Sequence, residues 1–425
     1  MSKEIDIKQG IDWTTIWLYI ILLAIGWFNI YAAVYNPEDR SIPWYSMSHN
    51  AGRQLLFIGT SLFLILIILF VDYKIYDTFA YIFYGFIILC LIATLFLATD
   101  IKGSRSWIKI GTFSLQPAEF AKTITALALA KFLSTQGTNI AKMRDTFRAC
   151  LLVFTPPIIV ILQKETGSAL VFAAFVIVLY REGLPGVYPA FGIAFIVLFV
   201  LSLIYPKGFI VLGLALLAVL FWYLFLKRYE RTRQNLYRII GMYCLFSVFV
   251  FGVDFFINNV LQPHHQKRIK VLVDPDIDPL GAAWNVTQSR IAISSGGFAG
   301  KGYLQGTQTK FDFVPEQSTD FIFCTVGEEW GFVGGFVVLA IYLILLTRLL
   351  NLAEKQKSKF ARIYGYSVAS IFFFHLLVNI GMTIGLMPVI GIPLPFISYG
   401  GSSLWSFTIL LFIFLKLDAH RSYKV

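Results

Sequence analysis

Long apolar segments alternate with short polar ones over almost the whole chain. Twelve of the apolar segments are long enough to cross a hydrocarbon core of roughly 30 Å as straight or tilted helices. They lie at residues 13–34, 53–71, 75–98, 115–133, 147–163, 168–182, 186–204, 208–227, 239–259, 322–347, 361–386 and 402–417. The pattern predicts an all-α fold, a polytopic transmembrane helix bundle with about 10 to 12 spans.

The composition agrees with this prediction. Of the 425 residues, 57% are hydrophobic and only 14% are charged, too few charges to cover a soluble domain of this size. The net charge of +11 would also suit nucleic acid, but in membrane proteins Lys and Arg gather in cytoplasmic loops and against anionic headgroups. The first apolar segment is too long for a signal-peptide core and is expected to remain as a span. The four cysteines show no spacing typical of disulfides or zinc.

Basic residues are concentrated in alternate loops, and this sets the expected orientation. Lys and Arg cluster at 142–148, 181, 227–238, 348–362 and 416–424, and the positive-inside rule places these segments and both termini in the cytoplasm. The long loop opens with a basic cluster that breaks the rule, which is weakest for loops of this length. The remaining loops are then extracytoplasmic, at 35–52, 99–114, 163–167, 205–207, 260–321 and 387–401.

The chain shows no sequence repeat and no separate soluble domain. Residues 1–425 are therefore predicted to form a single integral membrane domain with a long extracytoplasmic loop at 260–321. Within that loop, residues 284–293 have the periodicity of a short amphipathic helix, followed by a run of glycines. A loop of this length in a compact protein usually carries function.

The second half of the long loop contains two features that could support chemistry. Glycines at 296, 297, 300, 302 and 306 would allow positive φ angles and bring a ligand close to backbone N–H groups, or would simply let the loop turn several times. Asp320 stands directly before an apolar helix at its outer end. A carboxylate there is either a helix cap or a catalytic group, and its position alone leaves both open.

Further polar residues stand at the outer ends of predicted spans. Arg105 offers a fork of donors suited to phosphate, and Trp107 offers either a face for stacking on a sugar or an interfacial anchor. Glu119 and Lys122 are three residues apart on one helix and can simply pair, although ionisable groups inside a span are functional candidates by default. Glu165 lies in the next outward loop.

The last outward stretch, 387–403, contains three prolines and three glycines, which prevent a continuous helix. Such backbone is tolerated near membrane depth only against protein or a wet cavity. Glu328, Glu329 and His375 fall within predicted spans and are interpreted as polar contacts between helices.

The ordered motifs resemble the SEDS family (shape, elongation, division and sporulation) and, within it, the RodA-type branch. The resemblance covers nearly the whole chain except about 205–260, where the family's usual ten spans become twelve through a predicted extra helix pair. Ser106 stands where the family often has Arg, and Glu165 where it often has Asp. The matching motifs are Asp278-Pro279-Leu280-Gly281, Gln288-Ser289, Ser295-Gly296-Gly297, Gly300-Lys301-Gly302, Gly306-Thr307-Gln308, Pro315-Glu316, Thr319-Asp320-Phe321-Ile322-Phe323 and Pro393-Leu394-Pro395-Phe396-Ile397-Ser398-Tyr399-Gly400-Gly401.

The resemblance implies a peptidoglycan glycosyltransferase that polymerises lipid II into β-1,4-linked glycan strands and releases undecaprenyl pyrophosphate, for cell elongation and rod shape. It implies Asp320 as the general base or, with Glu119, as a ligand of a divalent cation such as Mg or Mn, and no organic cofactor. Arg105, Lys122 and Lys301 are then candidates for stabilising pyrophosphate charge. The remaining candidates for substrate binding are Trp107, Glu119, Glu165, Gln288, Ser289, Gln308, Glu316 and Ser398.

The resemblance also implies partners and a location. The expected partners are lipid II, the undecaprenyl-linked glycan, a class B penicillin-binding protein of the PBP2 type as transpeptidase, and other membrane proteins of the elongation complex, with no nucleic acid. The expected location is the bacterial cytoplasmic (inner) membrane, with the active site on the extracytoplasmic face. Two alternatives stay open. A lipid II flippase would need polar groups along a path through the membrane, and a non-catalytic scaffold would tolerate Asp320→Asn.

Overall fold

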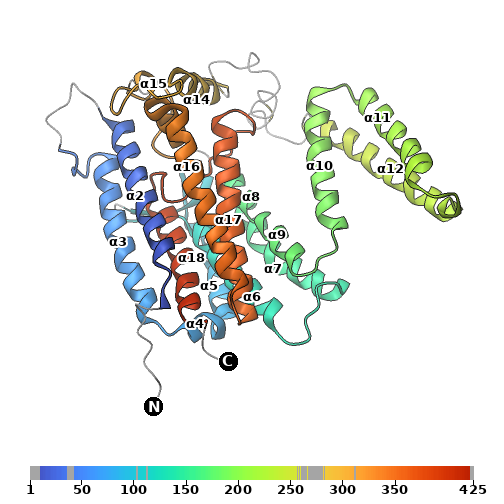
Figure 1. Ribbon diagram of the computed structural model, residues 1–425, viewed down its shortest axis with the longest axis horizontal. Coiled ribbons are helices and arrows are strands. Elements are labelled where there is room, and N and C mark those ends of the chain that lie inside the picture. Colours follow the sequence, from blue (N-terminus) through green and yellow to red (C-terminus); the bar gives the residue numbers. More distant parts are fainter. Residues whose placement is uncertain are drawn as a thin grey trace. The chain divides into compact units, whose positions relative to one another are not determined.

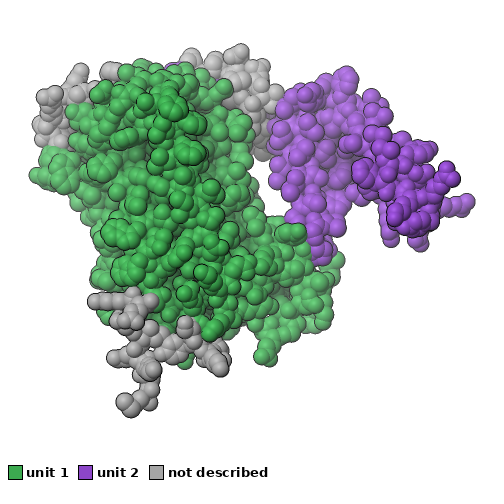
Figure 2. Space-filling model, in the orientation of Figure 1, with its two compact units in different colours: residues 1–184, 285–425 green, residues 185–284 purple. Residues whose placement is uncertain are grey.

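The computed structural model describes residues 10–35, 43–101, 104–111, 113–255, 257, 259, 266, 281, 283–310 and 313–421. Contacts divide the chain into two compact units (Figure 2): unit 1 is Met1–Leu184 with Asn285–Val425, and unit 2 is Pro185–Trp284. The described residues are mostly helical, which confirms the all-α prediction.

Unit 1 is a bundle of long helices with short helices at its ends (Figure 1). Most of the α17 surface is buried, because the helix packs against α6, α9, α16 and α18, and a helix that is apolar around most of its circumference suits such a central position. The helices of unit 1 are α2 (Trp13–Val34), α3 (Asn50–Phe70), α4 (Tyr73–Thr78), α5 (Ala80–Leu97), α6 (Pro117–Ser134), α7 (Met143–Leu162), α8 (Thr166–Val171), α9 (Ala174–Arg181), α14 (Trp284–Ser295), α15 (Thr307–Lys310), α16 (Ile322–Glu354), α17 (Lys359–Thr383) and α18 (Gly401–Ala419).

Unit 2 contains α10 (Val187–Ile204), α11 (Lys207–Leu220), two short helical turns (Phe221–Phe225 and Arg228–Glu230) and α12 (Arg233–Phe255). The second and third of its long helices lie within the 205–260 range of the predicted extra pair. Leu198, Ile210 and Val250, one from each long helix, form its small apolar core.

Among the described residues, ten helices are long and apolar enough to cross a membrane. Each of the twelve predicted spans corresponds to helical structure, but two of them are not among these ten. The span predicted at 115–133 is α6, which carries Glu119, Lys122 and Lys131. The span predicted at 168–182 is divided between α8 and α9.

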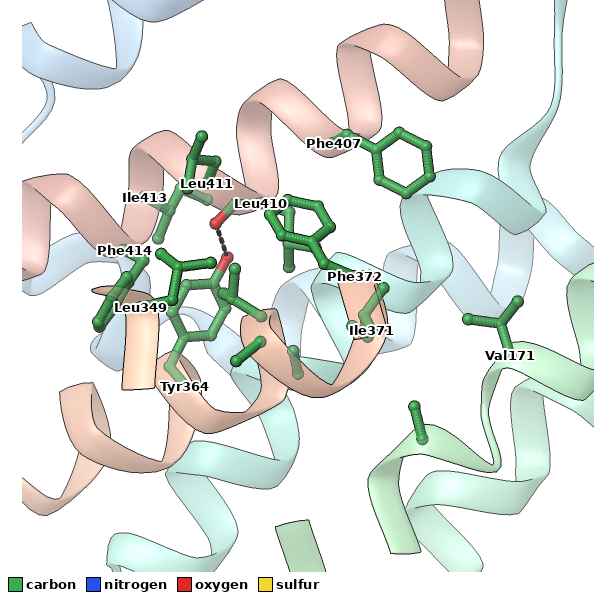
Figure 3. Packing of buried hydrophobic residues seen from close by; sticks show 14 of the residues in the cluster. Val171, Leu349, Tyr364, Ile371, Phe372, Phe407, Leu410, Leu411, Ile413 and Phe414 are labelled. Carbon is green, nitrogen blue, oxygen red and sulfur yellow. Dashed lines mark hydrogen bonds between the residues drawn. The ribbon is translucent and has the colours of Figure 1, made fainter. Parts of the chain in front are cut away.

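The core of unit 1 is mostly apolar between its two ends. Figure 3 shows side chains of α17 and α18 interlocking, among them Phe372, Phe407 and Phe414. Within this packing the hydroxyl of Tyr364 donates to the carbonyl of Leu410 at 3.1 Å. A buried hydroxyl with a partner avoids the cost of an unsatisfied polar group, so it fits the apolar core.

A small antiparallel sheet was missed in the sequence, where 99–114 was expected to be a loop. Its strands, in the order β1-β2-β3, are β1 (Thr99–Ile101), β2 (Ser104–Ile110) and β3 (Phe113–Leu115). The run of β2 is rich in β-branched and aromatic residues, which is the signal that could have found it. The sheet ends directly before α6 and so fixes how that helix begins.

Candidate active site

Loops that are far apart in sequence meet at one end of unit 1. The N–H of Arg105 donates to the carbonyl of Gln163 at 3.0 Å, and the N–H of Tyr399 donates to the carbonyl of Ser318 at 2.9 Å. The side-chain amide of Asn50 donates to the hydroxyl of Ser318 at 3.0 Å. We call this the loop end of unit 1, and its described segments are 43–52, 104–111 with 113–115, 163–167, 285–310 with 313–321, and 387–401. All of them come from loops predicted to face outward.

A buried ionic cluster lies beneath these loops. The Lys122 ammonium donates to Oε2 of Glu119 at 2.8 Å and lies 3.0 Å from Nε2 of His375. Nδ1 of His375 lies 3.0 Å from the carbonyl of Pro393. Glu119 and Lys122 are only 2% and 1% exposed. The pairing expected from the sequence is therefore present, and a third residue from α17 joins it to the 387–401 loop.

Glu165 is the second carboxylate near this cluster. Its Oε2 accepts a hydrogen bond of 3.0 Å from the hydroxyl of Ser106 on β2. Burial raises the pKa of Glu165 above its usual value, and the nearby charge of Glu119 acts in the same direction, while hydrogen bonds from Ser104 and Ser106 oppose the shift. Ser106 thus orients a carboxylate.

Asp320 lies half-buried at the start of α16. The N-cap position of α16 is taken by Phe321, and Asp320 precedes it. The carbonyl of Asp320 accepts a 2.8 Å hydrogen bond from the side chain of Asn379. A methyl group placed on Gly391 would lie 3.2 Å from Oδ2 of Asp320, so this carboxylate rests against the backbone of the 387–401 loop.

The glycine-rich loop packs tightly on the first turns of α16. A methyl group on Gly296 would lie 2.0 Å from the carbonyl oxygen of Gly327, and one on Gly300 would lie 2.1 Å from that of Glu329. Gly331 breaks the helix with a φ of 63° and approaches Gly300 equally closely. These glycines are required because two backbones touch at this point.

The backbone donors of that loop are already paired within the protein. The N–H groups of Lys301 and Gly302 donate to the carbonyls of Glu328 and Glu329, at 3.1 and 3.0 Å. The sequence left two interpretations of the glycines open, a ligand cradle or a turning loop. The structure shows a third role, in which the loop clamps the start of α16.

Glu328 is the centre of this clamp. Its Oε1 accepts hydrogen bonds from the Lys301 ammonium at 2.7 Å and from the N–H groups of Thr307 and Gln308 at 2.7 and 2.8 Å. Its Oε2 accepts one from the N–H of Thr309 at 3.0 Å. Lys301, predicted to contact pyrophosphate, is thus held by a fully buried carboxylate.

The remaining predicted residues divide by exposure. Ser289 and Ser398 are buried, and both hydroxyl groups bond to the backbone. The Ser289 hydroxyl donates to the carbonyl of Thr383 at 2.9 Å. The Ser398 hydroxyl accepts from the N–H of Leu394 at 2.8 Å. Arg105 and Glu316 are exposed, and Trp107, Gln288, Lys301 and Gln308 are partly exposed. The structure brings all of them to the loop end of unit 1, and their contacts with substrate stay predictions.

A metal site of three protein ligands is not formed by the described residues, where no group of three His, Cys, Asp or Glu side chains is close enough to hold an ion. Glu119 fits poorly as a ligand, because its carboxylate is buried and already bonded to Lys122. The divalent cation therefore stays a prediction.

The fold and this end of the bundle define a polytopic membrane protein with buried ionic groups beneath a layer of loops. The family model FTSW_RODA_SPOVE, described as "Cell cycle protein", matches residues 13–241 and 216–423. The chain therefore belongs to the FtsW/RodA/SpoVE family, which confirms the resemblance inferred from the motifs.

Curated relatives match the chain almost end to end. The peptidoglycan glycosyltransferase RodA of Treponema pallidum (strain Nichols) is 32% identical over 96% of this chain and 98% of its own length. The peptidoglycan glycosyltransferase MrdB of Escherichia coli (strain K12) is 29% identical over 95% and 93%. The stage V sporulation protein E of Bacillus subtilis (strain 168) is 30% identical over 98% and 99%.

Solved structures agree. A chain of the structure described as "Structural coordination of polymerization and crosslinking by a peptidoglycan synthase complex" superposes with a TM-score of 0.70 at 26% identity, covering 98% of this chain and 99% of that one. The Thermus thermophilus rod shape determining protein RodA gives a TM-score of 0.62 at 24% identity, covering 98% and 99%, and supports the fold alone.

Proposed function

We propose that the chain is a peptidoglycan glycosyltransferase that polymerises lipid II at the loop end of unit 1. The observation that carries the proposal is the convergence of five distant loop segments at the end of unit 1 that contains Asp320 and the buried Glu119–Lys122 pair. Relatives named as peptidoglycan glycosyltransferases match this chain over nearly its whole length. The basic segments at 142–148, 348–362 and 416–424 support, by the positive-inside rule, a location of the loop end outside the bacterial cytoplasmic membrane.

The reaction at this end is an inverting displacement. The 4-hydroxyl of an incoming lipid II attacks C1 of the muramyl residue at the reducing end of the growing chain. A β-1,4 bond forms as the α-linked bond to undecaprenyl pyrophosphate breaks, and the pyrophosphate leaves with the bonding electrons. Asp320 takes the hydroxyl proton, and such a general base contributes about 10² to 10⁴ in rate.

The three basic residues predicted to stabilise the leaving pyrophosphate differ in exposure and in their ion-pair partners. Arg105 is exposed on β2, so its guanidinium is available for a direct bidentate contact with phosphate oxygens. Lys122 and Lys301 are bonded to the carboxylates of Glu119 and Glu328. We therefore assign direct contact to Arg105, and we assign to Lys122 and Lys301 the holding of the loops and a fixed positive charge beneath them.

An enzyme fits the interior of unit 1 better than a flippase does. A flippase needs polar groups along a path through the membrane, because an unsatisfied polar group in hydrocarbon is costly. The space between α17 and α18 is filled instead by Phe372, Phe407, Leu411 and other apolar side chains (Figure 3). Lys122 and His375 pack on the Phe407 ring, at the edge of this apolar layer.

The expected transpeptidase partner belongs to the same proposal. One structural neighbour comes from a peptidoglycan synthase complex that coordinates polymerisation with crosslinking. We propose that this chain likewise works with a class B penicillin-binding protein of the PBP2 type, which would crosslink the strands that it makes.

The experiment uses the chain purified with its cognate class B penicillin-binding protein in detergent, with fluorescent lipid II as substrate and gel analysis of the products. Polymer from the wild type, and at least about 10²-fold less from Asp320→Asn at equal amounts of complex, supports the proposal. Detergent leaves no two membrane faces, so a flippase gives no product in this assay. Absence of polymer from the wild type, beside an active control polymerase, contradicts the proposal.

A further inference from the structure

We infer that His375 and Asn379 of α17 are positioning residues for polymerisation, Asn379 acting on Asp320 and His375 acting on Lys122. This inference rests on the proposed function. The two side chains are four residues apart, which places them on one face of the helix. Both are fully buried. Neither is placed to touch substrate, so each would act through the residue to which it is bonded.

Asn379 holds the two segments that meet at the Asp320 carboxylate. Its side-chain nitrogen donates to the carbonyl of Asp320 at 2.8 Å and to the carbonyl of Ile392 at 2.7 Å. Asp320 and Gly391 are the two residues in contact at this point. The Asn379 amide therefore fixes the backbone of both segments that meet where Gly391 touches the Asp320 carboxylate. The position of that carboxylate depends on this contact.

The chemistry of the amide explains why asparagine suits this position. Both neighbours are carbonyl oxygens, which only accept, so the nitrogen and not the oxygen must face them. The Oδ1 atom of Asn379 is buried and has no hydrogen-bond partner among the described residues. An unsatisfied buried acceptor costs stability, so this residue serves by its two donors. An aspartate at this position would place a carboxylate, which only accepts hydrogen bonds when ionised, against two carbonyl oxygens, and both bonds would be lost.

His375 does the same for Lys122. The carbonyl of Pro393 lies 3.0 Å from Nδ1 and can only accept, so Nδ1 carries the proton. Nε2 is then the acceptor, and the Lys122 ammonium at 3.0 Å donates to it. A neutral imidazole in this tautomer suits the buried ammonium, because a protonated ring would repel it and lose the bond.

The two residues together set the register of the 387–401 loop. They hold the adjacent carbonyls of Ile392 and Pro393, while their other bonds lead to Asp320 and Lys122. Misplacement of a reacting group by 1 Å can cost about 10²-fold in rate. Loss of either side chain would let the loop, and with it the Asp320 carboxylate, move by such a distance.

The test measures kcat and KM for lipid II polymerisation by the complex with its partner transpeptidase. We expect Asn379→Ala and His375→Leu to lower kcat by about 10- to 10²-fold and to leave KM within a factor of about two. Asn379→Asp should lose more than Asn379→Ala, and Asn379→Ser, which keeps one donor, should lose less. The matched control is Ser367→Ala, a buried residue of the same helix whose hydroxyl donates to the carbonyl of Ile363 within α17, at 2.9 Å.

A double variant separates positioning from general damage. If Asn379 acts through Asp320, adding Asn379→Ala to Asp320→Asn should cause no further loss in kcat, because the group being positioned is already gone. A kcat for Asn379→Ala equal to that of Ser367→Ala, beside an Asp320→Asn variant whose kcat is lowered at least about 10²-fold, overturns this inference and leaves the proposed function standing. A fully active Asp320→Asn overturns the role of Asp320 in the proposed function itself.

Discussion

The two ends of unit 1 both contain buried charges, but they use them differently. At the end opposite the loops, Arg348 pairs with Asp12 and Gln356 bonds to Asp418 at 2.5 Å. These contacts join one helix end to another. At the loop end, Glu328 accepts hydrogen bonds from the backbone of the glycine-rich loop. Lys122 contacts the His375 ring, which in turn bonds to the carbonyl of Pro393 in the 387–401 loop. Burial of charge alone therefore does not identify the site.

Backbone conformation separates the two ends more sharply. Within the described chain, the non-glycine residues with positive φ are Lys164, Leu304, Glu316 and Phe396, and all four lie in the segments of the loop end. Such conformations cost about 1–3 kcal/mol each and cluster at functional sites. The opposite end is built to hold helices together, whereas the loop end also holds strained backbone in place.

The largest expected effect comes from removing the carboxylate at the centre of the glycine-loop clamp. Glu328→Ala should abolish polymerisation and lower the free energy of unfolding by about 2–4 kcal/mol, because the Lys301 ammonium and three N–H groups lose their acceptor. Glu354→Ala is the control on the same helix, since Glu354 lies at the opposite end and pairs with an exposed Arg181. Equal thermal unfolding of the two variants would show that the clamp is not structural.

A smaller effect is expected where the 387–401 loop touches the Asp320 carboxylate. Gly391→Ala should lower kcat about 10-fold, through a methyl group 3.2 Å from Oδ2 of Asp320. Gly385→Ala is the control, because Gly385 has a similar φ of 81° but a methyl group there would meet the side chain of Arg290. If both variants lose activity equally, backbone strain and not the contact with Asp320 explains the loss.

Arg105 tests direct contact with the substrate. Arg105→Gln should raise KM for lipid II about 3- to 10-fold, as expected for the loss of one exposed, charge-assisted contact with phosphate. Lys109→Gln removes another exposed charge from the same strand and should leave KM unchanged. A matching rise in both variants would indicate a general effect of surface charge.

The smallest effect on polymerisation is expected at the opposite end. Partial burial would raise the pKa of Asp12, but hydrogen bonds from Arg348 and Thr15 outweigh it and hold the pKa below the usual 3.8. The ionised form is therefore the stabilising one. The contribution of the ionised Asp12 to the free energy of unfolding is fully present above its usual pKa of 3.8 and is lost as the pH falls through the lowered pKa of the folded state. Asp12→Asn, which keeps a capping side chain, should cost about 1 kcal/mol of stability above pH 5 and leave kcat unchanged.

Measuring the unfolding free energy of Asp12→Asn and the wild type from pH 3 to 7 checks this assignment. The difference between them should shrink as the pH falls toward the lowered pKa of Asp12. A difference that stays constant over this range would show that the charge of Asp12 does not contribute to stability.

The helices could be predicted from the sequence because long apolar segments have few alternatives in a membrane. The span at α6 was found despite Glu119 and Lys122, and their pairing followed from their spacing. The glycine motif can be recognised in the sequence, but its role in clamping the start of α16 cannot. That role depends on how closely residues 296–300 approach residues 327–331, about thirty positions later in the chain. Asn379 was missed, although a polar amide in an apolar span is the same kind of signal that singled out His375.

The most direct measurement compares two aspartates at the two ends of unit 1. The rate of lipid II polymerisation is measured for Asp320→Asn and Asp12→Asn, each in complex with the partner transpeptidase and at equal amounts of folded protein. We predict a loss of at least about 10²-fold for Asp320→Asn and a rate equal to that of the wild type for Asp12→Asn. Equal rates for the two variants would contradict the placement of the catalytic centre at the loop end.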